Sequence, residues 1–178
     1  MEIFQIFIIG TTGYILLILF DLAIIWGKEI LKRVTLAGFV LTAVPYVLLY
    51  GLFDSPHSVP VQIILYSLLA VCAGLLVFSV FLEVRLFSSS CEGTLYKGGT
   101  YRISRHPGFL WYTGINCVIA VVFFRWEVMT LVIGLTIDNF LLIFLEDTVL
   151  FPRMFEGYDA YKREVPFLFS LRLKRGKR

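Results

Sequence analysis

Long apolar stretches alternate with short polar segments along most of the chain. Five stretches approach the roughly 20 apolar residues that a helix needs to cross about 30 Å of hydrocarbon, and they cover residues 3–25, 34–53, 60–82, 108–124 and 128–145. Backbone groups in lipid must be hydrogen-bonded within the protein, and runs of this length match helices rather than barrel strands. The pattern therefore predicts an all-α, multi-pass integral membrane protein with about five transmembrane helices.

The composition excludes other classes of protein. Hydrophobic residues make up 58% of the chain and charged residues only 16%, a balance that a water-soluble domain does not carry. A disordered chain is excluded too, because such chains are poor in apolar and aromatic residues. Cys72, Cys91 and Cys117 stand alone in the sequence, so neither a disulfide framework nor a metal site is indicated.

The basic residues are distributed very unevenly between the connections. Every Lys and Arg except Arg125 falls in the first connection, in the third connection or in the tail after the fifth stretch. The positive-inside rule then predicts a cytoplasmic C-terminal segment and an external N-terminus, in the inner membrane if the source is prokaryotic. The basic run 172–178 is expected to lie on anionic lipid. It lacks the surrounding aromatic-interleaved basic domain that nucleic-acid binding would call for.

The third connection contains a candidate anion pocket. Gly98 and Gly99 permit a tight turn, and Pro107 suits the first turn of a helix because its missing N–H would be unpaired there anyway. The fourth span is therefore predicted to begin at Pro107. Since a helix N-terminus offers free donors and a positive dipole end, Arg105 and His106 beside it are candidate anion ligands. The alternative interpretation is a basic membrane anchor.

Acidic and amide side chains gather at the end of the fifth span. Glu146 and Asp147 lie at the carboxyl end of that predicted helix, where the dipole disfavours anions. Asp138 and Asn139 lie inside the apolar span, where an aspartate costs about 2.5 to 3.5 kcal/mol on insertion scales. Because Asn139 and Glu146 are seven residues apart, they share a helix face. We expect a polar stripe that faces the bundle interior, with interhelical hydrogen bonding as the alternative role.

Three further features have simpler interpretations. Tyr158 and Tyr161 are three residues apart in a segment that allows a short surface helix, and taken alone they would be interfacial anchors. Asp21 and His57 are lone polar residues without a partner motif. Both are expected to be structural.

The last 85 or so residues resemble a family of membrane enzymes. The resemblance is to the isoprenylcysteine carboxyl methyltransferase family and its phospholipid methyltransferase relatives, and the spacing fits within each of two blocks. The residues that carry it are Leu95, Gly99, Tyr101, Arg102, Arg105, His106 and Pro107, then Glu146, Asp147, Leu150, Tyr158, Tyr161, Val165 and Pro166.

The resemblance implies a methyltransferase that uses S-adenosylmethionine at the inner membrane surface, with the methyl group directed into a cleft between the fourth and fifth spans. It assigns catalytic roles to Arg105, Glu146 and Asp147. The cofactor-binding residues that it implies are Tyr101, Arg105, His106, Pro107, Glu146, Tyr158 and Tyr161. The acceptor-binding residues are Phe109, Trp111 and Asn139.

The expected organisation is three transmembrane helices over residues 1–82 followed by a methyltransferase-like region over residues 83–178. The expected acceptor is a membrane-embedded amphiphile, with a prenylcysteine-like carboxylate first and a phospholipid amine as the alternative. An Arg-His-Pro element also occurs in NADPH-dependent membrane reductases, which gives a second enzyme hypothesis. A non-catalytic membrane protein that keeps the fold is the third.

The predicted topology can be tested at Cys91, which lies in the third connection. Because charge bias places this connection in the cytoplasm, an impermeant thiol reagent should label Cys91 only after the cells are permeabilised. Labelling of Cys91 in intact cells would invert the topology.

Overall fold

The computed structural model describes residues 2–87 and 95–169, and within these ranges the chain forms helices and loops with no strand. Cys91 and the basic run 172–178 lie outside the described residues. The all-α fold class predicted from the apolar pattern is confirmed.

The first half of the chain forms three long helical rods. They comprise α1 (Ile3–Ile25), the consecutive helices α2 (Glu29–Thr35) and α3 (Ala37–Leu52), and α4 (Val59–Val77) continued by the π-helical turn η1 (Phe78–Leu82) and by α5 (Glu83–Phe87).

The second half forms two long rods and a small end region. They comprise the 3₁₀ turn η2 (Gly99–Arg102), α6 (Pro107–Phe123), α7 (Trp126–Leu145) continued by the π-helical turn η3 (Glu146–Leu150) and α8 (Phe151–Met154), and the short α9 (Tyr158–Glu164).

All five predicted spans are helices, and four of them are long and apolar enough to cross a membrane. The remaining span, the fourth along the chain, is α6 and has 17 residues. At 1.5 Å per residue it is about 25 Å long, which is close to the lower limit for a span. It begins at Pro107 as predicted. Two rods continue past their predicted ends, to Phe87 and to Met154. Hydropathy detects where a helix stops being apolar, and both rods continue as helix into the polar sequence beyond that point, through α5 after Leu82 and through η3 after Leu145.

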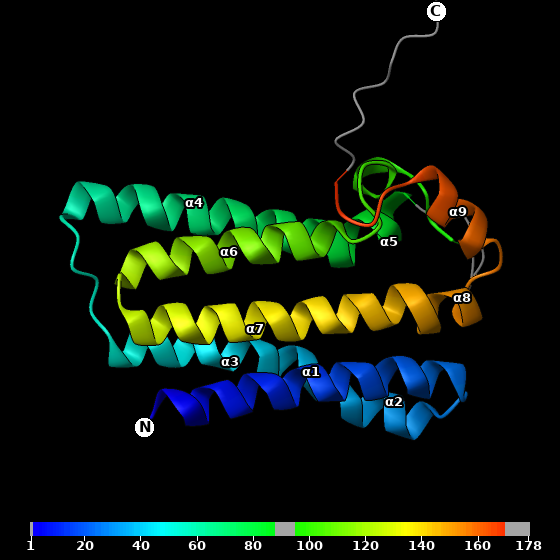
Figure 1. Ribbon diagram of the computed structural model, residues 1–178, viewed down its shortest axis with the longest axis horizontal. Helices are drawn as coiled ribbons and strands as arrows, with labels where there is room; N and C mark the ends of the chain where they lie inside the picture. The colour runs from blue at the N-terminus through cyan, green and yellow to red at the C-terminus, as the bar shows by residue number, and fades with distance from the viewer. Residues whose placement is uncertain (1, 88–94, 170–178) are drawn as a thin grey trace, which may run out of the picture.

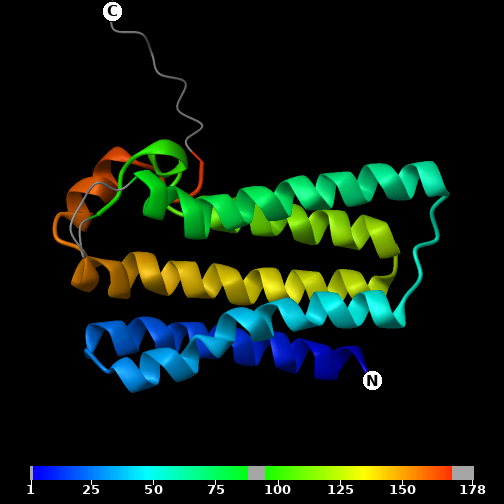
Figure 2. The ribbon, with the colours of Figure 1, turned by 180° about the vertical axis from the view of Figure 1, so that it is seen from behind.

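The five rods lie side by side with their long axes roughly aligned (Figure 1). Helix α1 packs against α3 and α7, α7 packs against α6, and α6 packs against α4. The connections α1 to α2 and α5 to α6, together with α8 and α9, lie at one end of the bundle, as Figure 2 shows from behind. We call this end the basic end. Among the residues that the structure describes, it holds every Lys and Arg except Arg125.

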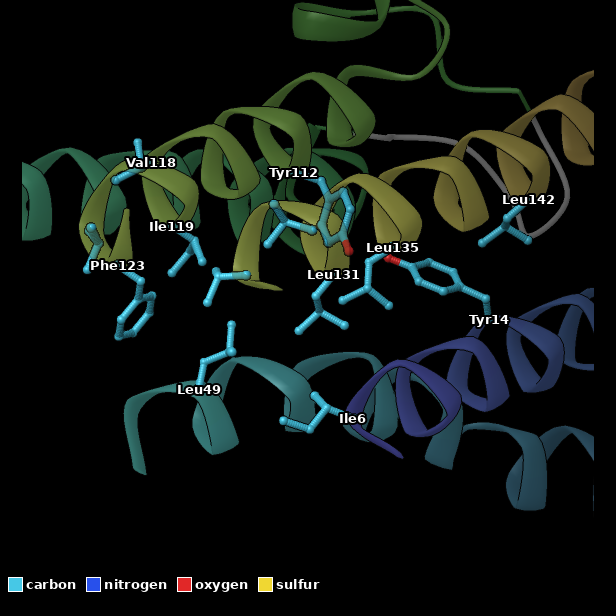
Figure 3. Packing of buried hydrophobic residues seen from close by; sticks show 13 residues of the cluster. Ile6, Tyr14, Leu49, Tyr112, Val118, Ile119, Phe123, Leu131, Leu135 and Leu142 are labelled. Atoms are coloured by element: carbon cyan, nitrogen blue, oxygen red, sulfur yellow. The ribbon is translucent and has the colours of Figure 1, made fainter. Parts of the chain in front are cut away.

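A hydrophobic core fills the half of the bundle away from the basic end. Ile6, Leu49, Ile119 and Leu135 come from α1, α3, α6 and α7 and pack there with almost no exposure (Figure 3). Helix α4 has no buried residue, and large aliphatic side chains remain exposed along it. Such a surface suits contact with lipid.

Two glycines bring the backbones of α1 and α3 into contact. A Cβ added at Gly38 would lie 2.8 Å from the carbonyl oxygen of Gly13, and one added at Gly13 would lie 2.8 Å from the backbone nitrogen of Thr42. Backbone atoms cannot move aside as a flexible side chain can. Close approach through small residues is how membrane helices associate without a hydrophobic driving force.

We therefore predict that Gly38→Ala lowers the apparent melting temperature of the purified protein, because overpacking costs about 1 to 3 kcal/mol. Gly74→Ala is the matched control, since nothing lies within 4 Å of a Cβ at this helical position. Equal melting temperatures for the two variants would show that the α1–α3 contact is looser than described.

Candidate functional site

A cavity of about 600 Å³ lies inside the bundle and is lined by residues of α1, α3, α4, α6 and α7. Its volume is within the range of roughly 300 to 1,000 Å³ that is usual for ligand sites. Most of its wall is apolar, including Leu17, Phe39, Leu69, Ile115 and Leu142. A cleft between the fourth and fifth spans, α6 and α7, was expected. The observed cavity is wider, because α1 and α3 form much of its wall.

The cavity becomes polar toward the basic end. Asp21, Tyr101, His106 and Glu146 line this part. Asp21 of α1 and Glu146 of η3 come from elements that are in contact with each other. Nδ1 of His106 lies 3.7 Å from Oε2 of Glu146. We call these four side chains the polar head of the cavity.

Arg105 forms a bidentate ion pair with Asp147 next to the polar head. Its Nε lies 2.8 Å from Oδ1 of Asp147, and its Nη2 donates a hydrogen bond to Oδ2 at 3.1 Å. Its Nη1 donates to the carbonyl oxygens of Lys162 and Val165 at 2.9 and 3.1 Å. Nη1 and Nη2 thus donate hydrogen bonds within the protein, whereas Nε makes a close ion contact without hydrogen-bond geometry. Both charged side chains are less than one-tenth exposed.

Asp147 gathers further donors from the C-terminal region. The hydroxyl of Tyr158 donates to Oδ1 at 2.8 Å. The ammonium of Lys162 lies 3.4 Å from Oδ2 and donates to the backbone carbonyl of Asp147 at 2.9 Å. A buried carboxylate is tolerated only when it is paired and hydrogen-bonded in this way.

These contacts fasten residues 158–167, which we call the clasp, to the start of α6. The hydroxyl of Tyr161 donates to the carbonyl of Tyr101 at 2.6 Å. The backbone N–H of Arg105 donates to the carbonyl of Pro166 at 3.1 Å, and Oγ of Ser104 donates to that of Phe167 at 3.2 Å. The two sequence blocks, 40 or more residues apart, are therefore structural partners of each other.

His106 is held between aromatic rings at the inner face of the clasp. It stacks on Phe151 with a centroid distance of 5.8 Å and meets the edge of Phe167 at 5.0 Å. Its buried Nε2 faces Asp147, with Oδ1 at 3.5 Å, but hydrogen-bond geometry is not met. Burial lowers the pKa of His106 below its usual value even though Asp147 acts in the opposite direction. The imidazole is therefore neutral at pH 7.

Glu83 and Tyr101 fix the turn that precedes α6. The hydroxyl of Tyr101 donates to the carbonyl of Ser79 in η1 at 3.0 Å, and burial, with the charge of Glu83 second, raises the pKa of Tyr101 to about 12. Glu83 is buried and accepts hydrogen bonds from the backbone N–H and the hydroxyl of Thr100. Gly99 has φ +46°, and a Cβ there would collide with the Glu83 carboxylate. Position 99 of the predicted turn therefore needs glycine for two reasons, the positive φ and the lack of room for a side chain.

The structure separates the predicted site residues into two groups. Those that line the cavity are Tyr101, Arg105, His106, Pro107, Phe109, Asn139 and Glu146. Asp147, Tyr158 and Tyr161 lie in the clasp network and do not line it. Arg105 and Asp147 bind each other, and the catalytic roles predicted for them stay predictions.

Trp111 and Asn139 show that the position of a residue around its helix determines whether it lines the cavity. Trp111, predicted to bind the acceptor, does not line the cavity because it lies two residues after Phe109 and so on another side of α6. Asn139 shares the cavity wall with Glu146, as the seven-residue spacing predicts. Asp138 takes the interhelical role and accepts a hydrogen bond of 2.6 Å from Thr11 of α1.

A chain of hydroxyl and amide groups, which the sequence reasoning missed, crosses the middle of the bundle. A hydrogen bond of 2.6 Å joins the hydroxyls of Tyr46 and Tyr112. The Tyr46 hydroxyl lies 2.7 Å from Oδ1 of Asn116, whose Nδ2 donates to Thr136 at 2.8 Å. Tyr14 points its hydroxyl toward Tyr112 (Figure 3). The signal in the sequence that could have revealed this chain is the presence of polar residues inside apolar spans. The same signal could have revealed Asp21, which belongs to the polar head.

Comparison of the chain with protein-family models, with curated proteins and with solved structures gave no match. The geometry itself describes a chamber with an apolar body and a polar head. The head holds two carboxyl groups, a phenol and a neutral imidazole. Among the described residues that line it, Arg105 is the sole Arg or Lys, and its nitrogens are engaged. The chamber thus suits a ligand that has an apolar part and a head with positive charge or hydrogen-bond donors.

Arg105→Lys should loosen the clasp, because a point charge cannot replace a planar fork that has several partners. Each charge-assisted hydrogen bond lost costs about 1.5 to 3 kcal/mol. We predict a lower melting temperature and faster tryptic cleavage after Lys162 or Arg163. Arg102→Lys, at an exposed position on the same turn, is the control. Identical cleavage of the two variants would mean that Arg105 does not fasten the clasp.

Proposed function

We propose that this chain is an integral membrane methyltransferase that transfers a methyl group from S-adenosylmethionine to an amphiphilic acceptor. The observation that supports this proposal most is the cavity. Residues of both sequence blocks build its polar head, and the apolar chamber behind the head lies among membrane helices. The proposed reaction needs such a place, where a hydrophilic cofactor and a lipid-like acceptor can meet.

The polar head fits part of the cofactor well. Glu146 suits the ammonium or the ribose hydroxyls, while His106, Tyr101 and Phe151 offer surfaces and hydrogen-bonding groups to the adenosine. The cofactor supplies an activated methyl group, so the protein has to orient the reactants and exclude water. Arg105 does not suit the methionine carboxylate, because its nitrogens are taken. The backbone N–H of Gly108, which lines the cavity in the first turn of α6, is the better donor for it.

The acceptor is proposed to bind with its tail in the apolar chamber and its head among the polar residues. Burial of a tail contributes about 0.8 kcal/mol for each methylene group, so a tailed acceptor should react far more efficiently than its truncated head group. The resemblance offers two kinds of head, a prenylcysteine-like carboxylate and a phospholipid amine. Both kinds of molecule reside in the bilayer.

The basic end of the bundle is proposed to face the cytoplasm, with the N-terminus outside. The clustering of the described basic residues at this end supports the orientation. It places the polar head of the cavity on the side of the membrane where S-adenosylmethionine is made.

The competing functions have less support from the site. A reductase that uses NADPH needs a cation for the 2′-phosphate, and the one Arg among the described cavity residues is bound to Asp147. A non-catalytic membrane protein would have no use for a chamber with buried carboxyl groups at one end. Burial of such groups is costly without a functional return.

Thermal stability with and without cofactor tests the proposal. S-adenosylmethionine at 100 times its dissociation constant should stabilise the detergent-purified protein by about 2.7 kcal/mol. Glu146→Gln should lose most of this stabilisation, and Glu29→Gln, an exposed acid at the same end of the bundle, should keep it. Stabilisation by NADPH alone would favour the reductase, and stabilisation by neither would favour the non-catalytic protein.

A further inference from the structure

Three tyrosines from three different rods meet on the wall of the apolar chamber. Tyr14 comes from α1, Tyr46 from α3 and Tyr112 from α6, and all three line the cavity. The rings of Tyr14 and Tyr46 each meet the ring of Tyr112 edge to face, with centroids 6.3 Å apart. The wall residues about one turn further along, Leu17 and Ile115, are apolar. The chamber behind the polar head therefore carries a separate group of hydroxyls, and the proposed function gives this group no role.

The hydrogen bonds that leave this group run in one direction. Thr136 donates to the carbonyl of Val132 at 2.7 Å and accepts from Nδ2 of Asn116 at 2.8 Å. Oδ1 of Asn116 can only accept, so the Tyr46 hydroxyl donates to it. The hydrogen between Tyr46 and Tyr112 therefore belongs to Tyr112. The Tyr112 oxygen is left as an acceptor at the cavity end of the chain.

Tyr14 is a second, independent sign of a ligand at this place. Its side chain is 5% exposed, and its hydroxyl points toward Tyr112 (Figure 3). Among the residues that the structure describes, this hydroxyl makes no hydrogen bond of its own, although a phenol buried this deeply usually has a partner. A donor on Tyr14 and an acceptor on Tyr112, both on the cavity wall, indicate that a polar ligand group completes the pair.

The pair determines which kind of group it can bind. A hydroxyl can donate to Tyr112 and accept from Tyr14 at the same time, whereas a carbonyl can only accept and a methylene can do neither. A charged group is disfavoured, because the wall around the pair is apolar and burial of an unpaired charge is costly. The pair therefore selects a hydroxyl.

Helix geometry gives the position of that hydroxyl along the ligand. His106 of the polar head directly precedes α6, and Tyr112 lies on the same helix. At 1.5 Å per residue, the six steps from His106 to Tyr112 span about 9 Å along the helix axis. This is roughly the length of seven carbon–carbon bonds in an extended chain, taken over the same helix rise.

We propose that the chamber binds an amphiphile with a hydroxyl group in its tail, and that Tyr14 and Tyr112 hold this hydroxyl while the head of the amphiphile lies in the polar head. Tyr14 and Tyr112 thereby become ligand-binding residues. The binding site stands on the cavity and its hydrogen bonds. Only the consequence that this hydroxylated amphiphile is the methyl acceptor rests on the proposed function.

The test compares three isomeric probes, hexadecane-1,4-diol, hexadecane-1,8-diol and hexadecane-1,12-diol, added at equal mole fraction to the protein in neutral detergent micelles. The readout is the dissociation constant of each probe. The 1,8-diol should bind about twofold to tenfold more tightly than its isomers, the equivalent of one neutral hydrogen bond. Tyr14→Phe removes only a hydroxyl and should erase this difference. Tyr66→Phe, on α4 and outside the cavity lining, is the matched control and should keep it.

Equal binding of the three diols, or a 1,8-diol preference that persists in Tyr14→Phe, would overturn the inference. Tighter binding of 8-oxohexadecan-1-ol than of the 1,8-diol would also overturn it, because the site would then only donate. A 1,8-diol with a photoreactive group at carbon 9 covers the case in which the variant does not fold. In the native protein it should label Leu17 or Ile115 on the chamber wall, and labelling of exposed α4 positions alone would contradict the inference.

The outcomes also separate this inference from the proposed function. Stabilisation by S-adenosylmethionine without any preference among the diols would overturn the inference and leave the proposed function standing. A preference for the 1,8-diol without any effect of the cofactor would do the reverse.

Discussion

The buried ion pair between Arg105 and Asp147 determines the geometry of the whole basic end. Its guanidinium and carboxylate are joined by two close contacts, and the remaining donors around them come from the clasp. Each partner has a neighbour in sequence that points into the cavity, His106 beside Arg105 and Glu146 beside Asp147. Pairing of the first two side chains therefore brings the second two to within 3.7 Å. Desolvation makes a buried pair a poor source of stability, so its value here lies in the arrangement that it fixes.

Irregular helical turns make that arrangement possible. Both η1 and η3 are π-helical, and each directly precedes or contains acidic residues at the basic end. A π turn holds one more residue than an α turn, which changes the direction of the side chains that follow and frees carbonyl groups. The Ser79 carbonyl accepts the hydroxyl of Tyr101 in this way. Such turns occur frequently at functional sites, and here they border the cavity from two sides.

Sequence reasoning predicted the fold well because hydropathy is a property of whole segments. It located every rod and the start of α6 at Pro107. It also placed the two blocks of polar residues at one end of the bundle. It could not predict which polar groups would neutralise each other. Arg105 looked available for a ligand until Asp147 and the carbonyls of the clasp were found around it. Asp21 had no motif, and only the packing of α1 against the rest of the bundle brings it into the cavity that Glu146 also lines.

Arg105 and Asp147 act as one unit, and a double-mutant cycle measures their coupling directly. The free energy of unfolding would be compared for the unaltered protein, Arg105→Met, Asp147→Asn and the double variant in mixed micelles. Each single substitution leaves one buried charge without its partner, so the double variant should lose much less than the sum of the two. We expect a coupling energy of at least about 1.5 kcal/mol. Additivity within about 0.5 kcal/mol, the behaviour of independent sites, would contradict the claim.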